Sequence, residues 1–499
     1  MRTSRAFIYL ATLVSGAAVM AGEITAGRLV APYYGTSNLV WALVIGAVLG
    51  SLALGNIVGG WLSRRFDPRL TAGWLLLGAG AALFLLPIVA LPVMRHSLQL
   101  FVSGRTGTLV ASAVAITGLL GLPMVILGAL SPLLIQALVD RANHTGSLAG
   151  RLYALSTAGG LIGTYLSGLV LVPVVGTRAT FWLCALALAL CGTWPLLRLS
   201  RLRRWSAASL ALVPCVLAGG AGRGTDPGML YEGETRYNHV RVQQSGGKRR
   251  LLLNDGFSTQ SVCHLDGTLP LDRVWGWYAA APAHTRTGRP RRVLLLGLGA
   301  GTGASIYRQL YPGATVTGVE IDGELVRLGQ RWFGLPAQTR VVVDDARAFL
   351  QRDRGRYDVV IVDAFQFPYV PFQLTTREFF LALQTRLARG GAVMLNVGRD
   401  GRSHDLVDAV ARTAADVFPR VRGADAGRYN TILVATEHGP AQEAGLDALG
   451  LPAAARRHLA RRRPLRPWSV RSDAPLLTDD HAPVEAITDR IVIRRLLGP

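Results

Sequence analysis

The chain has 499 residues, of which 50% are hydrophobic, and its formal net charge is +22 at pH 7. This length accommodates two large folded units. No module that combines basic and aromatic residues is present, and the excess charge is divided between residues 1–222 (+12) and the rest (+10). The composition therefore argues against nucleic acid as a partner and favours a surface that faces anionic lipid.

Residues 1–222 contain 15 Arg and only three acidic residues. Their apolar stretches approach the roughly 20 residues needed to cross a bilayer, so we expect an α-helical transmembrane bundle, the lipid bilayer as a partner and a multi-pass protein of the cell (inner) membrane. A further apolar run at residues 206–219 is short and contains Pro214, so the sequence does not decide whether it forms a seventh span. Six spans are expected near residues 6–27, 38–62, 71–94, 108–138, 149–173 and 178–197.

Arginine clusters fall on one side of these six spans, and the positive-inside rule makes that side cytoplasmic. Both ends of the chain then lie in the cytoplasm, where we expect the C-terminal domain. A seventh span would instead export that domain. The clusters are Arg2 and Arg5, then Arg64, Arg65 and Arg69, then Arg141 and Arg151, and finally Arg198, Arg201, Arg203 and Arg204.

The second span carries glycines at a four-residue spacing, Gly46 with Gly50 and Gly55 with Gly59. Small residues at this spacing allow two helices to approach closely. We therefore predict helix contacts at these four positions.

A glycine-rich stretch follows the membrane domain and indicates a flexible junction. Beyond it, alternating apolar and polar residues surround a turn at Ser245–Gly247, which predicts a hairpin. The expected units are a linker at 223–229, a β-rich subdomain at 230–290, an α/β domain at 291–440 and a C-terminal tail at 441–499, helical over 441–463.

The most informative motif lies in the α/β domain. An apolar strand at residues 293–296 leads into Gly297, Gly299 and Gly301, and the next strand, residues 315–319, ends in Glu320. The glycines let the backbone turn tightly and approach a ligand that any Cβ would push away. An acid about twenty residues after such a turn can bind ribose hydroxyls, so the order predicts a nucleoside-binding βαβ unit.

The glycine spacing is G-x-G-x-G-x-G, which differs from the G-x-G-x-x-G that holds a pyrophosphate. A ligand without phosphate fits better, which favours S-adenosylmethionine and its relatives over NAD. Asp345 and Ala346 follow the strand at residues 340–343, where an acid and a backbone amide could read the adenine edge. Asp345 is equally suited to be a helix N-cap.

Asp363 follows the strand at residues 357–362, at the carboxyl end where open α/β sheets bind their ligands. An Asp in this position is either a functional acid or a turn residue. The segment from Gln366 to Phe372 is rich in Pro and aromatic residues, and we expect it to form a lid over the pocket.

Taken together, these residues resemble the spermidine synthases (polyamine aminopropyltransferases), in particular their membrane-fused bacterial relatives, over roughly Tyr231 to Glu485. The resemblance rests on Tyr237-Asn238, Leu253 to Gly256, Gln260-Ser261, the glycine turn with Val319 to Asp322, Asp344 to Ala346, Tyr357 to Phe365, Tyr429 to Val434 and Leu477 to Glu485.

The resemblance implies a Rossmann-like domain of the S-adenosylmethionine-dependent methyltransferase type with a small β-hairpin subdomain. The implied reaction transfers an aminopropyl group from decarboxylated S-adenosylmethionine to a putrescine-like amine, without a metal. The resemblance also implies a homo-oligomer, which we expect to be a dimer. Glu320 would bind the ribose and Asp345 the adenine side, and Asp363 would take a proton from the attacking amine. Implied substrate residues are Tyr237, Asp255, Gln260 and Gln366.

Two departures from the family pattern concern the amine acceptor. The soluble enzymes usually continue with Ser-Ser-Asp-Pro where this chain has Ala364 to Phe367, so one acid is missing. They also carry Tyr-His-Glu where Tyr278 is followed by two alanines. Carboxylates surround ammonium groups in a polyamine pocket, and their loss leaves the identity of the acceptor open.

Two other functions stay open at this point. A methyltransferase that uses S-adenosylmethionine itself could employ the same glycine turn and Glu320. A non-catalytic polyamine or nucleoside sensor coupled to a membrane transport domain is the third possibility.

Overall fold

The computed structural model describes most of the chain, which divides into two compact units, residues 1–225 and 226–497. Each unit is treated separately below. The described ranges are residues 2–34, 38–102, 108–139, 145–196, 228–235, 237–254, 258–272, 274–364, 370–399, 403–461 and 464–488.

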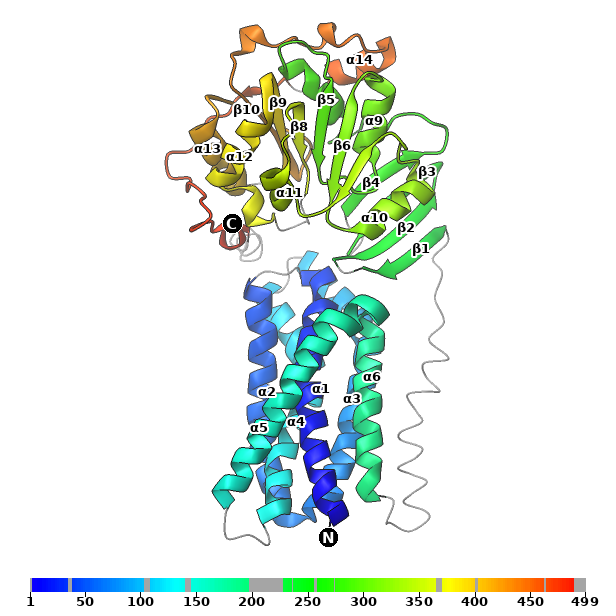
Figure 1. The fold of residues 1–499 in the computed structure, drawn as a ribbon, viewed down its shortest axis with the longest axis vertical. Coiled ribbons are helices and arrows are strands. Elements are labelled where there is room, and N and C mark those ends of the chain that lie inside the picture. Colours follow the sequence, from blue (N-terminus) through cyan, green and yellow to red (C-terminus); the bar gives the residue numbers. More distant parts are fainter. Residues whose placement is uncertain are drawn as a thin grey trace. The chain divides into compact units, whose positions relative to one another are not determined.

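The first unit is a bundle of apolar helices (Figure 1). Five helical stretches within its described residues are long and apolar enough to cross a membrane. The last of them extends from Gly146 to Leu196. The helices are α1 (Arg2–Tyr34), α2 (Asn38–Arg65), α3 (Pro68–Val102), α4 (Thr108–Val139), α5 (Thr145–Tyr165) and α6 (Val172–Leu196), with a π-helical turn at Leu166–Leu171 between the last two.

The stretch from Gly146 to Leu196 is broken at Gly176. A straight helix of its 51 residues would measure about 77 Å, far more than the ~30 Å hydrocarbon core of a bilayer. Gly176 has φ 84° and ψ 170°, a conformation that glycine adopts without strain and that interrupts the helix. The break lies between the two spans expected at residues 149–173 and 178–197.

Glycines allow helices of this unit to pack closely, and two pairs show the shortest backbone approaches. A Cβ on Gly55 would lie 2.3 Å from the Val125 carbonyl oxygen, and one on Gly59 would lie 2.2 Å from that of Ala129, so α2 contacts α4 through these glycines. The prediction is confirmed at both positions. It is wrong for Gly46 and Gly50, which face open space.

The second pair is α1 and α5, which the sequence did not indicate. A Cβ on Gly159 would lie 2.2 Å from the Leu13 carbonyl oxygen, and one on Gly163 would lie 2.1 Å from that of Ala17. Both helices therefore approach at backbone distance, as small-residue interfaces permit.

The second unit begins with an antiparallel sheet in the order β1-β2-β3-β4. The turn between β2 and β3 uses Gly246 (φ 57°) and Gly247 (φ 72°), because a tight hairpin needs two residues in the left-handed region. Val240, Val242 and Leu251 are buried and pack against helical residues of the following domain. The strands are β1 (Met229–Glu234), β2 (His239–Ser245), β3 (Lys248–Leu253) and β4 (Ser258–His264).

An eight-stranded mixed sheet follows, in the order β12-β10-β11-β9-β8-β5-β6-β7. Strands β7, β6, β5, β8 and β9 are parallel, whereas β11, β10 and β12 join antiparallel. This arrangement is Rossmann-like. The strands are β5 (Arg292–Leu296), β6 (Thr315–Glu320), β7 (Arg340–Val343), β8 (Tyr357–Val362), β9 (Leu387–Gly398), β10 (Arg420–Asp425), β11 (Asn430–Thr436) and β12 (Arg466–Pro467).

Helices cover both faces of this sheet (Figure 1). Alternate residues of β5 enter different cores: Val293 and Leu295 join one cluster, and Leu294 and Leu296 join the other. Both faces are apolar because β5 is a central parallel strand. The helices are α8 (Trp275–Ala280), α9 (Thr302–Leu310), α10 (Gly323–Leu328), α11 (Ala346–Arg352), α12 (Arg377–Arg386) and α13 (Asp405–Val417).

The expected helical tail is largely irregular. The prediction of a helix over residues 441–463 is wrong, because the only α-helix described there is α14 (Ala453–Ala460). Gly445 and Gly450 have φ values of 72° and 66°, and Pro452 lies just before α14, so the chain cannot continue one helix through this segment.

Candidate active site

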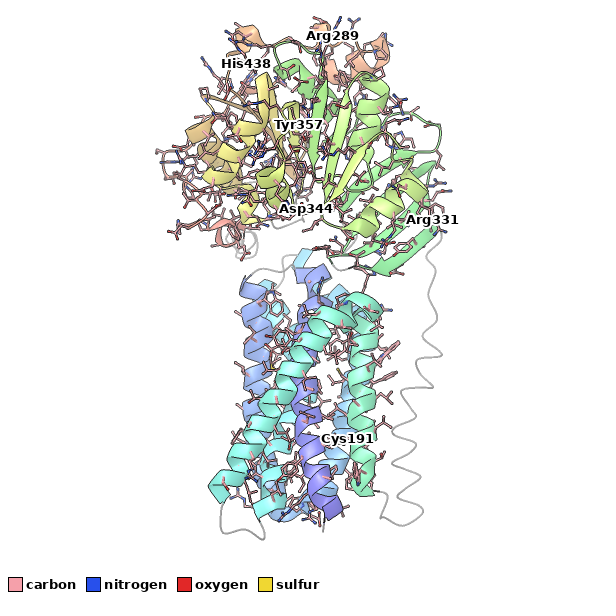
Figure 2. The ribbon with its side chains drawn as sticks, viewed as in Figure 1. Cys191, Arg289, Arg331, Asp344, Tyr357 and His438 are labelled. Atoms are coloured by element: carbon pink, nitrogen blue, oxygen red, sulfur yellow. The ribbon has the colours of Figure 1, made fainter. Side chains whose placement is uncertain are left out.

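The candidate site lies where the carboxyl ends of β5, β6 and β8 meet. The chain leaves β5 toward β6 on one side and returns through β8 on the other, so the strand order reverses at this point. Open α/β sheets bind their ligands in the crevice at such a reversal. Figure 2 shows Asp344, just past the end of β7, at this edge, and Tyr357, at the start of β8, farther into the domain.

The glycine turn after β5 has a backbone that other residues would not adopt. Gly297, Gly299 and Gly301 have φ values of 92°, 56° and 97°. A Cβ on Gly297 would lie 2.2 Å from the Asp363 carbonyl oxygen, and one on Gly301 would lie 2.5 Å from Leu335 Cδ1. Both the backbone conformation and the available space therefore require glycine here.

Glu320 ends β6 and holds the glycine turn in place. Its two carboxylate oxygens accept hydrogen bonds from the Gly299 amide (2.7 Å) and the Asp322 amide (3.1 Å). Burial raises the pKa of Glu320 to about 7, although these backbone donors favour the charged form. The carboxylate is thus positioned beside the turn, with further lone pairs that can accept hydroxyl protons.

Asp322 joins the small sheet to this site. Its carboxylate accepts hydrogen bonds from Asn238 Nδ2 (3.1 Å) and the Thr235 hydroxyl, both from the segment between β1 and β2, and it caps α10 through the Glu324 amide (3.1 Å). The role of Asp322 as the acceptor of these three hydrogen bonds was not predicted, because the donors are brought together only by the fold.

Asp363 lies directly after β8, and its carboxyl group is partly buried. Its backbone amide donates to the Leu296 carbonyl (2.8 Å), which fixes the residue beside the glycine turn. Asn396 Nδ2, on β9, donates to Asp363 Oδ1 at 2.8 Å. Burial raises the pKa of Asp363 to about 6, and the neighbouring Tyr278 and Asn396 side chains offset only part of this effect.

Tyr278 on α8 lies next to the same carboxylate. Its side chain is buried (3% exposed), and its hydroxyl faces Asp363 and Asn396 without completing a hydrogen bond to a described residue. Burial and the charge of Asp363 raise the pKa of this hydroxyl well above its ordinary value. A buried hydroxyl without a partner is costly in a folded protein, which is consistent with a ligand that supplies the partner.

From the sequence, Tyr278 was expected only as the one matching residue of the Tyr-His-Glu motif, and no role was predicted for Asn396. For Asn396 a signal was available, because a polar residue stands between Leu395 and Val397 inside a buried strand. For Tyr278 the local sequence offers no such signal, since α8 is entirely buried.

Of the two roles considered for Asp345, the structure shows the helix N-cap. Asp345 Oδ1 accepts hydrogen bonds from the Arg347 amide (2.9 Å) and the Ala348 amide (3.0 Å) at the start of α11. Ala346 is buried in the first turn of that helix. A contact of either residue with adenine stays a prediction.

Two of the four expected substrate residues lie within the described parts of the chain. Tyr237 lies between β1 and β2, and its amide donates to the Thr235 hydroxyl (3.0 Å). Gln260 lies on β4 beside the glycine turn, where the adjacent Ser261 hydroxyl accepts a hydrogen bond from the Ala300 amide (3.0 Å). Asp255, Gln366 and most of the expected lid lie outside the described residues.

The described part of the chain contains no cluster of His, Cys, Asp and Glu side chains that could hold a metal ion. The described site consists of the glycine turn, the buried carboxyl group of Glu320 and the partly buried carboxyl group of Asp363.

Part of the second unit is similar in sequence to a known protein family. Residues 279–425 match the spermine/spermidine synthase domain. A probable polyamine aminopropyl transferase of Bifidobacterium longum is 35% identical over 192 residues, which cover 38% of this chain and 42% of that protein. Over this stretch the chain spans less than half of its relative.

A longer match extends beyond the sheet domain. Polyamine aminopropyltransferase 2 of Ralstonia nicotianae is 28% identical over 459 residues, which cover 83% of each chain, so this similarity reaches both units. Among solved structures, a probable spermidine synthase from Corynebacterium glutamicum has 26% identity and a TM-score of 0.40, and the match covers 51% of this chain and 97% of that one.

Proposed function

We propose that the protein is a polyamine aminopropyltransferase, because residues 279–425 match the spermine/spermidine synthase domain. It transfers the aminopropyl group of decarboxylated S-adenosylmethionine to a small amine, such as a putrescine-like diamine. The observation that carries the proposal is Asp363, a partly buried carboxyl group with a pKa of about 6 directly beside the glycine turn.

In the proposed reaction the amine nitrogen attacks the aminopropyl carbon next to the sulfonium. A carbon–nitrogen bond forms, the carbon–sulfur bond breaks, and its electron pair neutralises the sulfur, which leaves as methylthioadenosine. The attacking amine must lose one proton, and Asp363 accepts it. A carboxyl group with a pKa near 6 is ionised at neutral pH and can act as this base.

The donor is held by the residues around the glycine turn. Glu320 accepts hydrogen bonds from the ribose hydroxyls, and the backbone of Gly297, Gly299 and Gly301 leaves room for the adenosine. Asp345 contacts the adenine side through the carboxylate oxygen that the helix cap does not use. Tyr237, Gln260, Asp255 and Gln366 contribute to the amine side.

We further propose that the helical unit anchors the enzyme in the cell membrane as a multi-pass domain, with the transferase domain in the cytoplasm and dimeric. The five apolar helical stretches support the membrane position, and the longest supplies two spans because Gly176 interrupts it. The cytoplasmic side follows from the arginine clusters.

The test is turnover by the detergent-purified full chain with decarboxylated S-adenosylmethionine and a panel of diamines, measured as methylthioadenosine release. We expect turnover in the wild type and a loss of about 10²- to 10⁴-fold in Asp363→Asn, which keeps the shape but not the base. Asp416→Asn, which alters an exposed ion pair with Arg377, is the matched control and keeps full turnover. Wild-type protein that binds the donor but releases no product would contradict the proposal.

A further inference from the structure

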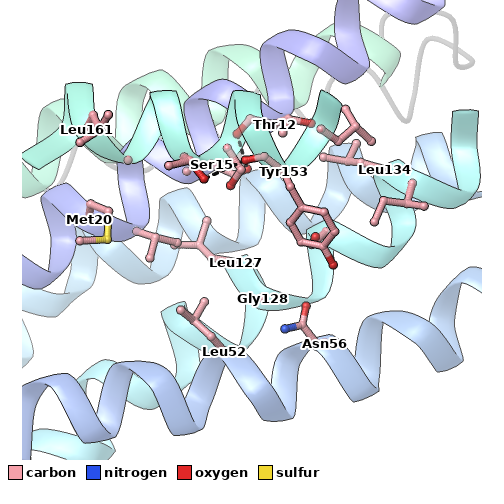
Figure 3. Close-up of a pocket in the computed structure, with 18 of the residues that line it drawn as sticks. Thr12, Ser15, Met20, Leu52, Asn56, Leu127, Gly128, Leu134, Tyr153 and Leu161 are labelled. Carbon is pink, nitrogen blue, oxygen red and sulfur yellow. Dashed lines mark hydrogen bonds between the residues drawn. The ribbon is translucent and has the colours of Figure 1, made fainter. Parts of the chain in front are cut away.

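A cavity of about 440 Å³ lies inside the helical unit, among α1, α2, α4 and α5 (Figure 3). Its volume lies within the range of about 300–1,000 Å³ that is typical of small-molecule sites. The cavity is bounded by the two glycine-packed pairs described above, since α1 packs on α5 and α2 packs on α4. It belongs to a different unit from the candidate active site.

The lining of this cavity is polar along part of its length. Thr12 and Ser15 of α1 are buried (6% and 8% exposed), and Ser131 of α4 lies with them along the cavity. Asn56 of α2 and Tyr153 of α5 are exposed, and in Figure 3 both project toward the space between these helices. A side-chain amide on an apolar helix is costly in lipid unless it has a polar partner, so Asn56 offers a contact for a polar ligand group.

Several hydroxyl groups that line the cavity already donate a hydrogen bond to a carbonyl of their own helix. The Thr12 hydroxyl donates to the Ile8 carbonyl (2.8 Å), that of Ser15 to the Thr12 carbonyl (3.2 Å), and that of Thr157 to the Tyr153 carbonyl (2.9 Å). Their oxygens keep lone pairs that can still accept hydrogen bonds. A ligand with hydroxyl or amide donors would match them.

None of the described residues that line the cavity carries a charge at neutral pH. A polyamine cation would enter this apolar surrounding without a carboxylate to compensate it, at a large desolvation cost. The remaining wall is aliphatic, with Leu127, Leu134 and Leu161 among its members. A neutral amphiphile satisfies both parts of the lining.

We propose that this cavity binds a neutral single-chain amphiphile whose head group carries hydroxyl or amide donors. The head group lies against Thr12, Ser15 and Asn56, and the aliphatic chain lies against the leucines. The exposed residues at α2 and α5 provide an entry from the hydrocarbon phase of the bilayer, which is where such a ligand is concentrated. This site is separate from the proposed aminopropyl transfer, so either could fail alone.

The experiment uses the full chain in phosphatidylcholine nanodiscs and a monoacylglycerol with a photoactivatable diazirine in its acyl chain. After irradiation, mass spectrometry locates the adducts. We expect adducts on cavity residues of α1, α2, α4 and α5, and at least fivefold protection by unlabelled monoacylglycerol but none by spermidine. Protection by spermidine would overturn the neutral-ligand assignment, and adducts that no competitor displaces would show annular lipid only.

Two conservative variants test the head-group contacts. Asn56→Leu and Ser15→Ala each remove one polar group of the proposed head-group site, and we expect the competing monoacylglycerol to bind about three- to tenfold more weakly in each. Thr193→Val, on α6 and outside the cavity lining, is the matched control and keeps wild-type affinity. Unchanged affinity in both cavity variants, with helix content preserved by circular dichroism, would overturn the proposal.

Discussion

The side-chain amide of Asn396 donates a hydrogen bond of 2.8 Å to the carboxylate of Asp363. The carbonyl oxygen of the same Asn396 side chain accepts one of 2.9 Å from Asn430 Nδ2. This second bond keeps the NH₂ group of Asn396 directed at Asp363. Asn430 on β11, Asn396 on β9 and Asp363 at the end of β8 therefore form a chain of hydrogen bonds across neighbouring strands. Because the donor favours the charged carboxylate, the pKa of Asp363 is lower than burial alone would make it.

The first prediction is that Asn396→Leu raises the pKa of Asp363 above about 6. Loss of one hydrogen bond to a charged group corresponds to about one pH unit. The acid limb of the kcat/KM profile, where Asp363 must be ionised, should therefore move to higher pH by about that amount. Thr413→Val, which removes a buried hydroxyl on α13, is the control. An acid limb at the wild-type position would show that Asp363 is not the titrating base.

The second prediction compares two buried tyrosines. Tyr278→Phe removes a hydroxyl without a partner and should leave the thermal stability unchanged or slightly higher, while turnover falls about 10- to 100-fold because the group faces Asp363. Tyr307→Phe removes a hydroxyl that donates to the Tyr278 carbonyl (2.9 Å), and should cost about 1 kcal/mol of stability with little change in turnover per folded molecule. Melting curves and steady-state rates separate the two. A destabilised Tyr278→Phe with normal turnover would reverse the assignment.

The third prediction concerns the glycine turn. Gly301→Ala places a Cβ 2.5 Å from Leu335 Cδ1 in a backbone with φ 97°. We expect donor affinity to fall at least tenfold and the midpoint of unfolding to drop by several degrees. Gly313→Ala, where a Cβ meets nothing within 4 Å, should behave as wild type in calorimetry and melting. Equal donor affinity in the two variants would rule out the turn as the nucleoside site.

The fourth prediction follows from the raised pKa of Glu320. A carboxyl group whose pKa is higher in the folded state than in the unfolded state binds more protons when folded, so its contribution to the free energy of unfolding decreases as the pH rises from about 4.5 to about 7. Donor binding should show the opposite trend, because the charged carboxylate accepts the ribose hydroxyls. We expect the donor dissociation constant to decrease about tenfold between pH 6 and pH 8. In Glu320→Gln this dependence should be lost, and its persistence there would assign the titration to another group.

The fifth prediction concerns the helical unit. If the long stretch from Gly146 to Leu196 forms two spans, a reporter fused after Leu196 and one fused at the C-terminus should both be active in the cytoplasm. The chain should also stay in the membrane fraction after alkaline carbonate extraction. An exported C-terminal reporter beside a cytoplasmic one at Leu196 would instead establish a seventh span.

The parts of the site that could be predicted from the sequence depend on local order along the chain. An apolar run, three glycines and a terminal acid lie within one βαβ unit, so Gly297, Gly299, Gly301 and Glu320 were identified with their geometric reasons. The two spans expected at residues 149–173 and 178–197 are likewise separated by the break at Gly176.

The features of the fold and the site that could not be predicted from the sequence depend on contacts between distant segments. Tyr278 lies next to Asp363 only because α8 packs against the central strands. The hydrogen bond from Asn396 to Asp363 depends on the register of β9 beside β8. The packing of α1 on α5 through Gly159 and Gly163 is likewise a tertiary result. In the tail, Ala and Leu content favoured a helix, but two glycines in the left-handed region and Pro452 prevent one.

The central claim is tested most directly by calorimetry on the detergent-purified full chain, comparing decarboxylated S-adenosylmethionine with S-adenosylmethionine. We predict at least tenfold tighter binding of the decarboxylated donor, abolished in Glu320→Ala and retained in Asp363→Asn. Tighter binding of S-adenosylmethionine itself would contradict aminopropyl transfer and indicate a methyltransferase.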